Sequence, residues 1–220
     1  MKDVIIFGTN DLAQLAKFYI ESDPSYSDYR VAAFTADQDH IRSPTFEDLP
    51  VVPFEEIEKT YSPDNFYLFA PLTGIKMNQV RRAVYNRGKA KGYKFISYVS
   101  SKATIFNNKI GENCFILEDN TLQPYTSIGN NVVMWSGNHI GHHSVVEDHV
   151  FFTSHVVMSG HCHIGERAWL GVNATLRDGL EIGEGTLIAM GSLITKNTET
   201  DSFYMGAPAK LQTRKSHEVY

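Results

Sequence analysis

The sequence predicts a small parallel α/β domain in residues 1–100, followed by a parallel β-helix with a C-terminal tail in residues 101–220. Before residue 100, short apolar runs alternate with amphipathic segments, which is typical of βαβ units. After residue 100, an apolar residue recurs at every sixth position, and this period fits neither a helix nor a long alternating strand. With 220 residues, of which 42% are hydrophobic, the chain is large enough to bury a core in each part.

The first 100 residues contain four runs of strand composition and two segments of helical periodicity. The expected strands are Val4–Phe7, Arg30–Phe34, Phe66–Phe69 and Lys94–Val99. We expect Asn10 or Asp11 to cap a helix that carries Leu12, Leu15, Ala16 and Tyr19 on one side. The second helix, Met77–Ala90, is expected to turn Val80, Ala83 and Val84 inward.

Fifteen consecutive hexads have an apolar residue at the same position. At 42% hydrophobic residues, chance would give this run about twice in a million. Three hexads close one triangular coil of eighteen residues, and coils stack at the ~4.8 Å spacing of neighbouring strands. The inward residues are Ile110, Ile116, Leu122, Ile128, Met134, Ile140, Val146, Phe152, Met158, Ile164, Leu170, Leu176, Ile182, Ile188 and Ile194.

Two further positions of the hexad have their own character. The position four residues after the apolar one is mostly small or β-branched and includes Cys114 and Cys162, which we expect to be buried, reduced thiols. The position just before the apolar residue gives a stripe on one outer face, and this stripe needs a cover, either the chain's own tail or a neighbouring subunit. The outer stripe comprises Phe115, Val133, Phe151, Trp169 and Leu187.

Composition excludes several classes of function. The net charge of −5 argues against a nucleic-acid-binding surface. No apolar run approaches the ~18 residues of a membrane helix, and the opening Met1–Gly8 is typical of a buried strand, not of a signal peptide. We therefore expect a cytoplasmic protein with neither membrane nor nucleic acid among its partners.

Seven of the nine histidines lie within twenty-five residues, and a cluster of imidazoles indicates proton transfer or metal binding. The eighteen-residue register stacks His143 under His161, whereas His142 lies under Gly160 and so has an open neighbour. His149 lies beneath Arg167, and His155 lies between Gly137 and Asn173; these two are expected to be structural or cofactor-facing. The seven are His139, His142, His143, His149, His155, His161 and His163.

The hexads Ile140-Gly141, Ile164-Gly165 and Ile182-Gly183, with Gly141–Val146 and Met205–Lys210, resemble the hexapeptide-repeat acyltransferases. The similarity is to the branch that acetylates nucleotide-linked amino sugars and sialic acid. It implies a Rossmann-like domain followed by a left-handed β-helix. It also implies acetyl-CoA as co-substrate, a nucleotide sugar as acceptor, and a homotrimer with coenzyme A between adjacent prisms.

This resemblance implies a role for His142 as the general base that takes a proton from the attacking amine or hydroxyl. The family usually has an acidic residue directly after the catalytic histidine, and this chain has His143 at that position. The partner that orients His142 would then be Glu147, Asp148 or a backbone carbonyl. His143 is itself a second candidate for the catalytic role. Phe151 stands where some relatives have a histidine that touches the thioester.

The resemblance also assigns the binding residues. Gly160, Gly171 and Asn173 match segments that line the pantetheine groove, and the N–H of Gly160 is a candidate oxyanion donor. The tail that closes over coenzyme A matches Gly206, Ala207, Pro208 and Lys210. In the first domain, Gly8, Asn10 and Asp11 follow a strand and precede a helix, where a diphosphate would bind, and Asp37 would contact a ribose or base.

Other readings of the same residues remain open. The loop at Gly8 could be a plain capped turn, and the basic run of Arg81, Arg82, Arg87, Lys89, Lys91 and Lys94 is more typical of a solvated helix face. O-acetylation of a sugar or sialic acid is the nearest alternative reaction. A γ-type carbonic anhydrase-like zinc protein is less favoured because His155 and His161 are six residues apart, and we expect no metal. A non-catalytic β-helix module is the third alternative.

Overall fold

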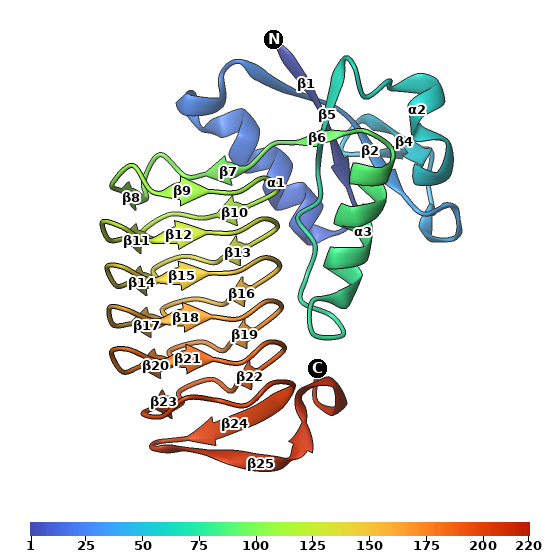
Figure 1. Ribbon diagram of the computed structural model, residues 1–220. Helices are drawn as coiled ribbons and strands as arrows, with labels where there is room; N and C mark the ends of the chain where they lie inside the picture. The colour runs from blue at the N-terminus through green and yellow to red at the C-terminus, as the bar shows by residue number, and fades with distance from the viewer.

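The computed structural model describes residues 1–220 and has two parts, an α/β sheet and a three-sided prism of stacked coils (Figure 1). The first sheet has the order β3-β4-β2-β1-β5-β6, parallel except for the β3–β4 pair. Its strands are β1 (Lys2–Phe7), β2 (Tyr29–Ala36), β3 (Thr45–Phe46), β4 (Leu49–Pro53), β5 (Phe66–Phe69) and β6 (Lys94–Phe95). The helices are α1 (Asp11–Ser22), α2 (Ile57–Thr60) and α3 (Gln79–Ala90), with 3-10 turns at Pro24–Tyr26, Gln38–His40, Phe54–Glu56 and, near the C-terminus, Ser216–Glu218.

The predicted elements of the first part form for the expected reasons. Val4, Ile5 and Ile6 of β1 are fully buried, and Asn10 caps α1 by accepting a hydrogen bond from the N–H of Ala13 at 3.2 Å. The expected strand Lys94–Val99 is in fact two strands, because β6 ends the sheet at Phe95 and β7 (Tyr98–Val99) begins the prism.

The prism consists of two-residue strands that pair, eighteen residues apart, into three parallel sheets, as the hexads predict. Sheet C contains β7, β10 (Phe115–Ile116), β13 (Val133–Met134), β16 (Phe151–Phe152), β19 (Trp169–Leu170) and β22 (Leu187–Ile188) and ends in the hairpin β24 (Ser202–Gly206) and β25 (Ala209–Lys215). Sheet D contains β8 (Thr104–Ile105), β11 (Thr121–Leu122), β14 (His139–Ile140), β17 (Val157–Met158), β20 (Thr175–Leu176) and β23 (Leu193–Ile194). Sheet E contains β9 (Lys109–Ile110), β12 (Ser127–Ile128), β15 (Val145–Val146), β18 (His163–Ile164) and β21 (Glu181–Ile182).

The inward columns form one continuous core that includes Cys114 and Cys162, and both thiols are free and buried. Turns of the chain join the three sheets at three edges of the prism, which we call the histidine corner, the domain corner and the tail corner. The histidine corner, between sheets D and E, contains residues 123–126, 141–144, 159–162 and 177–180. The domain corner, between sheets E and C, contains residues 129–132, 147–150 and 165–168. The tail corner, between sheets C and D, contains residues 153–156, 171–174 and 189–192.

The outer stripe on sheet C is covered by the first domain of the same chain (Figure 1). Phe115, Val133 and Phe151 share a core with residues of β1 and α1, and each is at most 5% exposed. The last two residues of the stripe meet the tail: the ring centroid of Trp169 lies 4.6 Å from that of Tyr220, and Leu187 lies beside Phe203 of β24 in the sheet. The expectation of a cover by the tail or by a second subunit was therefore wrong for most of the stripe, because the α/β domain packs there.

Helix α3 contacts the domain corner through a buried cation. Arg81, expected on a solvated face, is 1% exposed, while Val80 and Ala83, expected inward, are exposed. The guanidinium donates to the carbonyl oxygens of Asn131 and of His149, the latter at 3.1 Å. Burial lowers the pKa of Arg81 to about 9. The helix is turned from its expected orientation because Arg81 provides donors for corner carbonyls that water cannot reach.

His149 is the buried histidine of this contact, and it should make stability depend on pH. Burial, reinforced by the nearby Arg81 charge, lowers the pKa of His149 to about 4 from its usual 6.5. The unfolded chain then binds more protons between these values, so this contribution to stability is complete above pH 6.5 and is lost as the pH falls toward 4. We expect thermal melts to show this loss and His149→Asn, which suits the left-handed backbone there (φ 65°), to flatten it. If the melting temperature fell equally steeply with pH in His149→Asn and in the wild type, His149 would not be the source of this pH dependence.

No helix in the structure combines the length and the apolar content required to cross a membrane. The two longest, α1 and α3, have twelve residues each.

Candidate functional site

The histidine corner brings together the two histidines predicted to be catalytic and a third from the next coil. His142, His143 and His161 are exposed, and the Nδ1 atoms of His142 and His143 are 3.0 Å apart. The rings of His143 and His161 stack at 5.1 Å with an angle of 17°, as the register predicts. One ligand atom from each of the three lies within 4.8 Å of the others.

Glycine at position 160 allows this arrangement. A Cβ atom on Gly160 would lie 2.7 Å from Cε1 of His142 and 2.9 Å from its Nε2, so the imidazole rests directly on the glycine backbone. Below the site, Tyr125 is 78% exposed and lies 4.6 Å from His143 between ring centroids. The Gln123 side chain accepts a hydrogen bond from the N–H of His142 at 2.9 Å. Sequence reasoning missed both residues, although Tyr125 lies eighteen residues before His143 and Gln123 nineteen residues before His142.

The structure places neither acidic candidate next to the base. Glu147 accepts from His163 and from the N–H of Glu166, each at 2.8 Å, while Asp148 binds Asn130 across the domain corner. Nδ1 of His142 instead faces Nδ1 of His143, so one ring donates and the other accepts. The expectation that Glu147, Asp148 or a backbone carbonyl orients His142 was therefore wrong, because His143 is the hydrogen-bond partner of its ring.

The residues predicted to bind coenzyme A fall into two groups on different edges of the prism. Gly160 lies in the histidine corner, whereas Gly171 and Asn173 lie in the tail corner. The tail corner also receives the β24–β25 hairpin, because the N–H of Gly206 donates to the Ser192 hydroxyl at 3.3 Å. Ala207 and Pro208 form the turn of this hairpin and Lys210 lies in β25, and all three are exposed beside this edge.

The predicted nucleotide residues surround a cavity of about 340 Å³ in the α/β domain. It lies where the chain leaves the carboxyl ends of β1, β2 and β5, at the point where the strand order reverses. Gly8, Asn10 and Asp37 line it, and Asp11, the first residue of α1, does not. The lining that the sequence did not indicate is Thr9, His40, Leu72, Thr73 and Ile75, together with Phe7, Ala36, Val80 and Val84.

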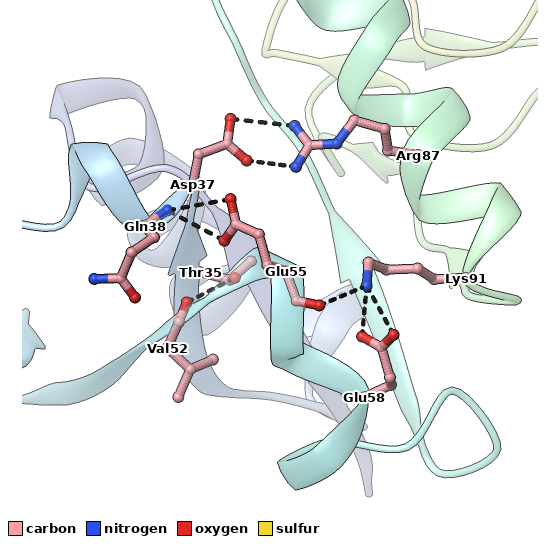
Figure 2. Close-up of polar contacts among 8 residues, drawn as sticks. All are labelled: Thr35, Asp37, Gln38, Val52, Glu55, Glu58, Arg87 and Lys91. Atoms are coloured by element: carbon pink, nitrogen blue, oxygen red, sulfur yellow. Dashed lines mark hydrogen bonds and ion pairs between the residues drawn. The ribbon is translucent and has the colours of Figure 1, made fainter.

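Asp37 already has a partner within the chain. Its two carboxylate oxygens accept hydrogen bonds from the two Nη atoms of Arg87 on α3, at 2.5 and 3.1 Å (Figure 2). Beside this pair, the Gln38 N–H donates to the Glu55 carboxylate and Lys91 donates to Glu58, and of these residues only Asp37 lines the cavity. Arg87 therefore holds Asp37 at the cavity with defined geometry.

The histidine corner and the nucleotide cavity lie on opposite sides of one chain. Sheet C faces the α/β domain, and the histidine corner, between sheets D and E, is the edge of the prism opposite sheet C (Figure 1). His155, in the tail corner, is likewise separated from His161, in the histidine corner. The spacing of His155 and His161 along one coil predicts no metal site, whereas His142, His143 and His161 span two coils and bring three possible ligand atoms together.

Comparison with known proteins agrees with this architecture. Residues 161–196 match a family model described as bacterial transferase hexapeptide (six repeats). A sequence search of curated proteins finds no match.

Several solved structures share the fold over nearly the whole chain. A perosamine N-acetyltransferase mutant from Caulobacter crescentus, in complex with CoA and GDP-perosamine, is 19% identical with a TM-score of 0.85, covering 97% of this chain and 98% of that one. The acetyltransferase domain of PglB from Neisseria gonorrhoeae is 18% identical with a TM-score of 0.83, covering 96% and 100%. WeeI from Acinetobacter baumannii is 19% identical with a TM-score of 0.75, covering 96% and 100%.

At these identities the similarity shows the fold, and it confirms the predicted class of a small α/β domain followed by a left-handed β-helix. The chain thus contains the hexapeptide repeat of the bacterial transferases, and it has the fold of the hexapeptide-repeat acetyltransferases that its sequence resembles.

Proposed function

We propose that this protein is an acetyl-CoA-dependent N-acetyltransferase that acts on the amino group of a nucleotide-linked sugar used in glycan or surface-polysaccharide biosynthesis. The single observation that carries the proposal is the His142–His143 pair at an exposed corner of a hexapeptide-repeat prism that follows a nucleotide-binding type of domain. The perosamine N-acetyltransferase of the same fold is described with CoA and GDP-perosamine, which supports both substrate classes. A cytoplasmic location, where both substrates are made, fits the reaction.

The chemistry requires one base and no covalent enzyme intermediate. With His142 donating from Nδ1 to His143, its Nε2 is free to accept a proton as the sugar amine attacks the thioester carbonyl. The tetrahedral intermediate then collapses with breakage of the C–S bond, and the departing thiolate takes the proton held by His142, so coenzyme A leaves as the thiol and the base is restored. The Gly160 N–H donates to no atom of the chain, and we propose it as the donor to the oxyanion.

Assembly into a homotrimer would complete the site. Within one chain, the nucleotide cavity lies in the α/β domain, and the tail corner and the histidine corner are different edges of the prism. A groove between two adjacent prisms would bring the tail corner of one chain to the histidine corner of the next. We expect light scattering in dilute buffer to give three chains per particle and calorimetry to show acetyl-CoA binding. A monomer that binds coenzyme A with full affinity would contradict this assembly.

The activity is tested by incubating the protein with acetyl-CoA and a panel of nucleotide sugars that carry free amino groups, with GDP, UDP and dTDP as the nucleotides. We expect release of free coenzyme A together with one acetyl group on the amine, detected by mass spectrometry. Matched sugars with a hydroxyl in place of the amine serve as the control. Transfer to these alone would favour O-acetylation, and transfer to none would refute the proposal.

A further inference from the structure

The His142, His143 and His161 trio has a second chemical capacity beyond acid–base catalysis. We propose that these three imidazoles form a binding site for one divalent transition-metal ion of the zinc type, and that an ion bound there inhibits the enzyme. The binding rests on the geometry of the corner alone, and the inhibition rests also on the proposed function of His142.

The three side chains lie close to the geometry that such an ion needs. Tetrahedral zinc holds imidazole nitrogens at about 2.0–2.1 Å, which places them about 3.3 Å from one another. The Nδ1 atoms of His142 and His143 are already 3.0 Å apart, and all three ligand atoms lie within 4.8 Å. All three side chains are exposed, so small rotations of the rings can close the remaining gap without displacing any core residue.

The backbone holds the trio in place. His143 and His161 have the same left-handed conformation, with φ of 55° in both, because they occupy the same corner position in consecutive coils. The N–H of His161 donates to the carbonyl oxygen of His142 at 2.9 Å, which fixes the spacing of the two coils. Three ligands from so rigid a frame are arranged in advance, and this lowers the entropic cost of binding.

The ligand set determines which ions bind and what they do. Three imidazoles and no carboxylate favour zinc, copper, nickel and cobalt over magnesium and calcium, which prefer oxygen ligands. Three protein ligands leave a fourth position for water or for the sugar amine. An ion on Nδ1 of His142 leaves the ring proton on Nε2 of the neutral imidazole, so Nε2 has no lone pair with which to accept the amine proton, and the ion's charge opposes formation of the imidazolium. A metal at this corner therefore inhibits the transfer that the same histidine promotes.

The test uses untagged full-length protein freed of metal by chelation. Calorimetric titration with ZnCl₂, and with CoCl₂ followed by visible absorption, should show one ion per chain, while MgCl₂ should give no signal. His161→Asn and His143→Asn suit the left-handed corner and should each lose at least ~100-fold in zinc affinity, more than typical changes to outer partners of a site. His155→Asn is the matched control, because His155 has the same left-handed backbone (φ 59°) on another corner, and it should keep wild-type affinity.

The outcomes separate the metal site from the proposed reaction. Zinc should inhibit acetyl transfer by the wild-type protein, a chelator should restore it, and His161→Asn should resist the inhibition. Absence of stoichiometric binding, or equal affinity in His161→Asn and wild type, would overturn the metal site whatever the activity. If the histidine-dependent binding holds but no transfer is found with any acceptor, the metal site stands and the proposed function fails.

Discussion

His142→Asn is expected to slow acetyl transfer by ~10²–10⁴-fold, the usual contribution of a general base. Asparagine keeps the size and some hydrogen bonding of the imidazole but cannot accept the amine proton. Because His142 is an exposed corner residue outside the apolar core, the melting temperature and the affinity for coenzyme A should hardly change. Steady-state rates at neutral pH, with calorimetry for coenzyme A, provide the measurements.

His161→Asn provides the comparison for this prediction. It alters the same corner and removes the ring that stacks on His143, yet it should cost far less than the loss of His142. A rate for His142→Asn within about threefold of wild type, well short of the tenfold that 1.4 kcal/mol represents, would place the base elsewhere. His143 would then be the first candidate, since its Nδ1 lies 3.0 Å from that of His142.

The prism could be predicted from the sequence because its repeat is strictly local. An inward residue at every sixth position fixes the strands, their register and the stacking of His143 on His161 without any reference to the rest of the chain. The contact between Gly160 and His142 follows from the same arithmetic. A side chain placed by periodicity needs no knowledge of tertiary packing, and this is why the corner was found.

The contact between the two parts could not be predicted in this way. Arg81 lies in a basic run that matches an exposed helix face, and only the unpaired carbonyls of Asn131 and His149 explain its burial. The outer stripe signalled that a cover was needed, but hydrophobicity does not identify what covers it. Asp37 was recognised as a residue at a strand end, whereas its pairing with Arg87, fifty residues away, depends on how α3 packs.

The same limit applies to the partner of the base. The family that the sequence resembles usually has an acidic residue after the catalytic histidine, and Glu147 and Asp148 are acidic residues that follow His142 closely in sequence. Both belong to the next corner, because each hexad turns the chain by one face of the prism. In a β-helix, residues a few positions apart in sequence can lie on different corners, whereas residues eighteen positions apart lie side by side on neighbouring coils. Tyr125 and Gly160, each one coil from a histidine of the pair, illustrate the second case.

Gly160→Ala tests whether the position of the imidazole, and not only its identity, determines the rate. A methyl group at position 160 would lie 2.7 Å from Cε1 of His142, which is closer than side-chain carbons approach, so the ring must move. The ring is exposed and can move without disturbing the core, and the melting temperature should therefore change little. A displacement of about 1 Å at a reacting group can cost ~10²-fold in rate, and we expect a loss of that order.

Gly179→Asn is the matched control, because Gly179 occupies the same corner two coils above His143. A Cβ atom there meets nothing within 4 Å, and asparagine tolerates its left-handed backbone (φ 70°), so activity and stability should stay at wild-type values. The kinetic constants distinguish two reasons for a loss in Gly160→Ala. A fall in kcat with little change in the KM for acetyl-CoA means that the ring of His142 has been displaced. A rise in that KM with kcat unchanged would mean that Gly160 lines the pantetheine groove and does not position the base.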